Sequence, residues 1–111
     1  MRSGKLTLLI LLGLVIGVLA GPANATAPVK VAKIVNYAFR PGKLTINKGA
    51  KVTWKWLGGF VGHNVWVSKG PVKFHSRDKA TGTYSHVFTR AGTYHFVCTL
   101  HPSMTETIVV R

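Results

Sequence analysis

The segment from Lys51 to Trp56 alternates lysine or threonine with valine or tryptophan, without a break. Successive side chains of a β-strand point to opposite faces, so this period of two puts Val52, Trp54 and Trp56 on one face and the polar residues on the other. The segment therefore predicts a half-buried strand. Such a strand must bury its apolar face against a second layer of structure.

Similar short segments, bounded by glycine and proline, recur from Val29 onward. Besides 51–56, the predicted strands cover residues 31–36, 43–47, 63–68, 83–89, 93–98 and 105–111. The polar segment 68–82 predicts a long connection with at most one short strand. No stretch after residue 29 has a convincing helical period. Seven or so short strands without a helix predict an all-β fold, an antiparallel sandwich of two sheets.

The first 25 residues have the composition of a secretory signal peptide. Arg2 and Lys5 give a basic start, the run Leu6–Ala20 is almost entirely apolar, and the small residues at 23–25 fit a cleavage site. The apolar run is shorter than the ~20 residues that span a bilayer comfortably. We therefore expect a signal peptide that is cleaved, with an uncleaved anchor as the alternative.

On this interpretation residues 26–111 form a single domain. The domain is exported to the periplasm or to the extracellular side of the membrane. Its size is small but sufficient for one economical core.

The chain is strongly basic. It has 15 lysines and arginines against two acids, and the first 25 residues hold two of those bases and neither acid, so the formal net charge of +13 becomes +11 for the rest. A charge of this size creates a strong positive field. The basic residues are scattered, as on solvated strand faces, and export argues against nucleic acid. An acidic protein partner, an anionic membrane surface and a simple contribution to solubility all stay open.

Residues 98–104 carry the main chemical signal. Cys98, His101 and Met104 stand at even three-residue intervals after a predicted strand, and Pro102 favours a loop there over a continuing strand. Three residues span at most ~10 Å, so a tight loop can direct all three side chains at one ion. A thiolate, an imidazole and a thioether suit copper in electron-transfer sites. Since Cys98 is the only cysteine in the sequence, metal ligation also explains a free thiol in an exported chain.

A copper site of this kind needs a second nitrogen ligand from elsewhere in the chain. The remaining histidines are His63, His75, His86 and His95. His63 is favoured because it follows a glycine-rich segment and shares a strand face with Val65 and Val67. His86 ranks second. His95 lies on the strand face opposite Cys98, and His75 lies in the polar connection.

Over nearly all of residues 26–111 the sequence resembles the cupredoxins, the type 1 blue-copper proteins, and most of all the plastocyanin and amicyanin group. The segments that carry the resemblance are 36–41, 46–49, 52–54, 62–65, 91–94 and the Cys-x-x-His-x-x-Met motif at 98–104. The short spacing of that motif is similar to amicyanin. The resemblance implies a Greek-key β-sandwich of seven to eight strands that holds one copper ion.

The resemblance also assigns roles to individual residues. It implies that His63 is the upstream nitrogen ligand, Cys98 the thiolate, His101 the exposed nitrogen ligand and Met104 the axial ligand. Asn64 would hold the cysteine loop by hydrogen bonding. Two residues depart from the family pattern: Leu100 replaces a frequent proline, and Glu106 stands where a glycine often follows the methionine.

The implied function is one-electron transfer between redox proteins, with copper cycling between Cu(I) and Cu(II). Electrons would pass through the exposed edge of His101, inside an apolar docking patch of Phe60, Leu100 and Pro102. The expected partners are redox proteins, including acidic ones. Association with an anionic membrane surface is a further expectation. The protein itself is expected to be a monomer. A periplasmic copper carrier or delivery protein is the alternative, and a metal-free adhesive sandwich is a weaker one. An enzyme is not expected, since one short domain with two acids offers little for a second metal centre or a substrate site.

Overall fold

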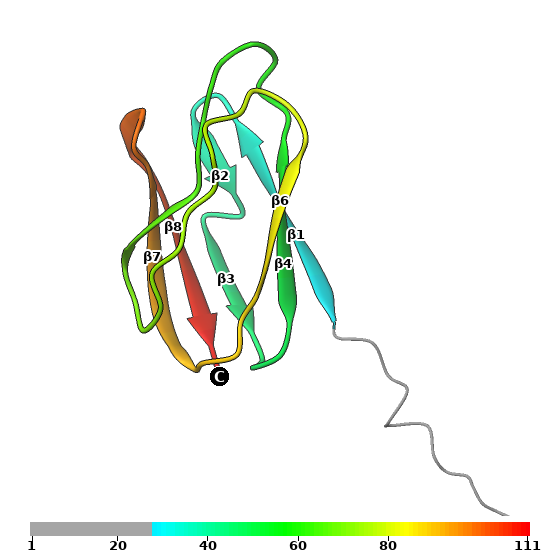
Figure 1. The fold of residues 1–111 in the computed structure, drawn as a ribbon, viewed down its shortest axis with the longest axis vertical. Helices are drawn as coiled ribbons and strands as arrows, with labels where there is room; N and C mark the ends of the chain where they lie inside the picture. Colours follow the sequence, from blue (N-terminus) through cyan, green and yellow to red (C-terminus); the bar gives the residue numbers. More distant parts are fainter. Residues whose placement is uncertain (1–27) are drawn as a thin grey trace, which may run out of the picture.

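Eight strands in two facing sheets make up the part of the chain that the computed structural model describes, residues 28–111 (Figure 1). The signal peptide expected at 1–25 lies outside the described residues. The strands are β1 (Val29–Val35), β2 (Ala38–Arg40), β3 (Lys43–Ile46), β4 (Lys51–Trp56), β5 (Trp66–Lys69), β6 (Thr83–Val87), β7 (Gly92–Cys98) and β8 (His101–Val110). The all-β sandwich predicted from the alternating segments is confirmed.

The first sheet has the strand order β2-β1-β4-β6 and the second the order β3-β8-β7-β5. Two of the pairings, β1 with β4 and β3 with β8, are parallel, whereas the sequence predicted an antiparallel sandwich. Both parallel pairs arise because the chain changes sheets between their strands: β3 lies in the second sheet between β2 and β4 of the first. A chain that crosses the sandwich in this way can re-enter a sheet in its original direction.

The core lies between the sheets and is lined by the apolar faces that the alternation predicted. Val52, Trp54 and Trp56 of β4 are all buried, and so are Tyr94 and Phe96 of β7. The Trp54 ring lies 5.3 Å from the Phe96 ring, so the two sheets meet through their aromatic side chains. Aromatic residues of this size supply much of the apolar area that so small a core can bury.

Three differences from the predicted strands are larger than a shift of one or two residues at an end. β2 was not predicted as a strand, because its three residues are too few to show alternation. β5 begins at Trp66 rather than at residue 63, and His63 forms an isolated bridge with Lys79 instead. Within the described residues the connection between β5 and β6 contains isolated bridges but no strand.

The third difference concerns the loop that carries the chemical motif. β8 begins at His101 and continues through Pro102, whereas Pro102 was expected to favour a loop. The pairing of Cys98 with His101 closes a tight turn, and the register shifts between Val97 and Cys98. A register irregularity is a place where a sheet tolerates proline, which has no N–H to donate.

Residues 28–111 include no helix with the length and apolar character that crossing a bilayer requires.

Candidate metal centre

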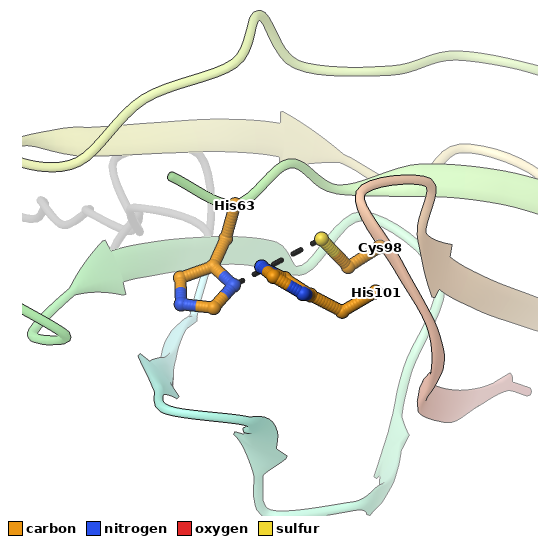
Figure 2. Close-up of side chains that lie close together, drawn as sticks. All are labelled: His63, Cys98 and His101. Carbon is orange, nitrogen blue, oxygen red and sulfur yellow. Dashed lines mark hydrogen bonds between the residues drawn. The ribbon is translucent and has the colours of Figure 1, made fainter. Parts of the chain in front are cut away.

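Three side chains from distant parts of the sequence converge near the turn between β7 and β8 (Figure 2). His63 precedes β5, Cys98 ends β7 and His101 begins β8. One ligand atom from each lies within 4.8 Å of the other two, and Nδ1 of His63 is 3.9 Å from Sγ of Cys98. The structure thus brings together three of the four residues that the sequence indicated.

Cys98 is held by its strand and by Asn64. It continues the inward face of β7 and is fully buried. The backbone N–H of Asn64 points at its Sγ at 3.4 Å. The Asn64 side chain spans the turn: its Oδ1 accepts from the Thr99 backbone N–H at 2.9 Å, and its Nδ2 donates to the Thr99 hydroxyl at 2.6 Å. The role that the resemblance implied for Asn64 is what the structure shows.

His63 is fixed through both its backbone and its ring. Its N–H and C=O bond reciprocally with Lys79 at 2.8 and 3.0 Å, and its carbonyl also accepts from Nε1 of Trp56 at 3.0 Å. Nε2 of the ring lies 2.7 Å from Oδ1 of Asn36. Burial, with a smaller contribution from His101, lowers the pKa of His63. A neutral ring that donates from Nε2 leaves Nδ1 free to bind a metal on the Cys98 side.

His101 lies at the surface end of the group and is half-buried. Its Nε2 lies 3.1 Å from the carbonyl oxygen of Gly62. The ring of Tyr37 packs edge-on against it with centroids 4.8 Å apart, and the His63 ring lies at 4.9 Å. His101 therefore connects the buried thiol to the protein surface.

Met104 lies on β8, three residues beyond His101, with its side chain 1 % exposed in the hydrophobic core. The remaining histidines are occupied elsewhere. His75 stacks on Trp66 at 4.1 Å and His86 on Phe74 at 3.5 Å, while His95 is exposed and its Nδ1 lies 3.4 Å from the Thr107 hydroxyl. The preference for His63 over His86 therefore agrees with the geometry.

The donor set fits a copper ion on two grounds. Bonds of ~2.0–2.3 Å to nitrogen and sulfur in a tetrahedral arrangement separate the ligand atoms by about 3.5 Å, close to the 3.9 Å between His63 Nδ1 and Cys98 Sγ. One thiolate and two neutral imidazoles together carry a single negative charge. With that set Cu(I) forms a neutral centre and Cu(II) a singly positive one, so the buried site carries little charge in either state.

Sequence reasoning missed two residues that shape this site. Asn36 is one, because its side chain bonds both His63 and the carbonyl of Gly58, the latter at 2.9 Å. Gly58 is the other, since a Cβ there would collide with the Asn36 side chain and come within 3.2 Å of His63 Nε2. The one indication of Asn36 in the sequence was its polar pair with Tyr37, which lies in the turn between β1 and β2. That hairpin was not predicted, because β2 has three residues.

Comparisons with known proteins also indicate copper as the metal. A family model described as copper binding proteins of the plastocyanin/azurin family matches residues 26–111. Amicyanin-alpha of Methylorubrum extorquens is 34% identical over 94 residues, which cover 81% of this chain and 75% of amicyanin-alpha.

Among solved structures, a reduced copper(I) form of an amicyanin variant superposes with a TM-score of 0.68 at 31% identity, covering 80% of this chain and 88% of that one. A copper-containing nitrite reductase from Thermus scotoductus gives a TM-score of 0.71 at 26% identity over 88% of this chain. This chain spans only 25% of that reductase.

Proposed function

Because this chain belongs to the plastocyanin/azurin family of copper-binding proteins, we propose that it is an exported blue-copper electron carrier that shuttles single electrons between redox proteins. The observation that carries the proposal is the group of His63, Cys98 and His101, buried at one end and reaching the surface through His101. Copper held by a group of this kind would exchange electrons with a partner without binding a substrate.

We propose that copper would be held by Nδ1 of His63, the thiolate of Cys98, one imidazole nitrogen of His101 and, more weakly, the thioether of Met104. The bound copper supplies a one-electron couple between Cu(I) and Cu(II). Met104 is included because it follows His101 by one more three-residue step and is buried in the core.

The protein's own part in the reaction is to hold the ligands in place. Asn64 fixes the turn beyond Cys98 through two side-chain hydrogen bonds to Thr99. Asn36 fixes the His63 ring through one hydrogen bond to Nε2, and its other side-chain bond goes to the carbonyl of Gly58. Cys98 and His63 are fully buried, so water has little access to them. Ligands that stay in place in both oxidation states reduce the rearrangement that accompanies each electron transfer.

Partners are proposed to dock where His101 reaches the surface. The expected patch residues Phe60, Leu100 and Pro102 are all exposed, and the relative exposure of Phe60 is 102%. Tyr37, against the His101 ring, is 59% exposed and joins this set. An exposed apolar patch around a redox group is suited to brief contacts with partner proteins.

Two further parts of the proposal concern activity and location. The nitrite reductase is four times as long as the matched segment, so its reaction is not carried over, and we propose that this chain is not an enzyme. Export to the periplasm or beyond rests on the signal-like residues 1–25. Delivery of copper to an acceptor is the alternative function, because it uses the same ligands.

Stopped-flow mixing of the Cu(I) protein with a one-electron oxidant separates the two functions. An electron carrier is expected to lose an electron within milliseconds to seconds, keep its copper through gel filtration and accept an electron again. Rapid transfer of copper to an apo acceptor, with no electron exchange, would instead establish the delivery function.

Replacing Asn36 with leucine is expected to lower copper affinity about 10- to 100-fold, because the His63 ring loses the partner that fixes its orientation. A competition titration with a copper chelator measures this. Asn36→Asp keeps an oxygen acceptor for Nε2 but loses the donation to the Gly58 carbonyl, so as the matched control it should lose less affinity than the leucine variant. Equal affinity in the leucine variant would show that Asn36 does not position His63.

A further inference from the structure

Cationic side chains form a row across the outer face of the β2-β1-β4-β6 sheet. Register places Lys33 of β1 directly opposite both Arg40 of β2 and Lys55 of β4, and all three side chains are exposed. Lys55 in turn pairs with Thr83 of β6, whose carbonyl accepts a hydrogen bond from Nζ of Lys79. Arg40, Lys33 and Lys55 are called the cationic band; Lys79 is left out of it, because its half-buried side chain lies over the ring of Trp56.

This arrangement acts against stability. Like charges directly opposite each other on neighbouring strands destabilise a sheet. The chain has two acids, and neither belongs to this sheet: Glu106 is buried on β8, and Asp78 lies between β5 and β6, where it accepts from Asn64. This face therefore carries a row of mutually repelling charges, although an acidic residue in place of Lys33 would attract both Arg40 and Lys55.

The other sheet provides a comparison within the same molecule. Its equivalent row runs from Lys43 through Thr107 and His95 to Lys69. Thr107 and His95 lie between Lys43 and Lys69, so no two lysines of this row lie directly opposite each other. Both rows contain basic residues. These residues are direct neighbours in the cationic band and are separated in the other row.

The cationic band lies close to the surface end of the metal centre. β1 and β2 are joined by a tight turn at Asn36 and Tyr37, and the pair Lys33–Arg40 is three residue steps, roughly 10 Å, from this turn. Tyr37 contacts the ring of His101. A partner of ordinary footprint, about 800 Å² on each side, extends ~16 Å from its centre and so covers His101 and the band together.

We propose that the cationic band is the docking flank for a redox protein with an acidic surface, which it holds with its redox group against His101. This inference rests on the proposed electron-carrier function. An acidic protein fits better than an anionic bilayer because the cations are contiguous beside the electron exit. The row at the far end of the same sheet face contains Val29, Lys51 and Val87, with one cation between two valines. Contacts between opposite charges at such a flank mainly raise association rates and fix orientation.

The test compares Lys33→Glu with Lys43→Glu, two variants with the same change in net charge on opposite sheets. Poly-L-glutamate serves as the acidic probe, and NMR titration at low ionic strength measures its affinity for the copper-loaded and the metal-free protein. Lys33→Glu is expected to weaken binding about fivefold or more, and Lys43→Glu less than about twofold. Shift changes in the wild type should centre on the band.

Lys33→Glu should also raise the midpoint of thermal unfolding, because it places opposite charges between Arg40 and Lys55. A weaker affinity in a more stable variant cannot result from misfolding.

Equal weakening in both variants would overturn the proposal in favour of a general effect of net charge. Selective loss of binding to phosphatidylglycerol vesicles, with poly-L-glutamate binding retained, would overturn it in favour of a membrane. The titration is also run on the metal-free protein, so its result does not depend on electron transfer. The stopped-flow experiment tests the electron-carrier function separately.

Discussion

Replacing Cys98 with serine is expected to abolish the visible thiolate-to-copper absorption band and to lower copper affinity by more than the 10- to 100-fold typical of losing an outer hydrogen-bond partner. The thiolate is the ligand that favours copper in a site otherwise built from imidazoles. A buried serine hydroxyl offers neither the charge nor the polarisable sulfur. Titration with Cu(II), followed by absorption, measures both effects.

Two measurements accompany this substitution. Thermal unfolding should show that the fold persists, with a loss of about 1–3 kcal/mol for a buried hydroxyl in place of a thiol. Met104→Leu removes only the weak axial ligand and is the control, which should keep a thiolate band. A band that survives in Cys98→Ser would mean that another group binds the metal.

The second large effect concerns Glu106, which is buried on β8 at 2% exposure. Its Oε1 accepts a hydrogen bond from Nε1 of Trp54 at 2.8 Å, while Oε2 is buried without a partner in the described structure. Burial raises the pKa of Glu106 to about 7, against a smaller lowering by the Trp54 hydrogen bond. The folded protein therefore binds the proton of this carboxyl more tightly than the unfolded chain does.

The sign of the pH effect follows from that difference. Between the ordinary pKa of 4.5 and about 7, the folded state holds more protons than the unfolded state, so the free energy of unfolding falls as pH rises. Over this window the group should cost about 3 kcal/mol of stability. Denaturant unfolding at pH 4.5, 6 and 8 measures the slope.

Glu106→Gln isolates this contribution because it removes the titrating group and keeps an acceptor for Trp54. The difference in unfolding free energy between the wild type and this variant should change by about 3 kcal/mol across the window. A difference that is flat with pH would show that Glu106 ionises as an ordinary carboxyl.

The grouping of His63, Cys98 and His101 was more predictable than the topology. Cys98, His101 and Met104 are close in sequence, so their spacing alone indicated a common target. His63 could be chosen over His86 because it lies on the inward face with Val65 and Val67, and all three side chains are buried.

Other features have no local signature in the sequence. The parallel pairing of β1 with β4 depends on where the chain changes sheets, which alternation within a strand does not encode. Asn36 contacts His63 across 27 positions, and the juxtaposition of Lys33 with Arg40 and Lys55 depends on register. Glu106 departs from the family pattern in the sequence, but only the fold shows that its carboxyl is buried against Trp54.

The measurement that most directly tests the central claim is the visible spectrum of the wild-type protein after addition of one equivalent of Cu(II). We expect an intense thiolate-to-copper band that disappears on reduction and returns on reoxidation. Stoichiometric binding of Cu(II) with only weak absorption, unchanged by a reductant, would contradict a site built from His63, Cys98, His101 and Met104.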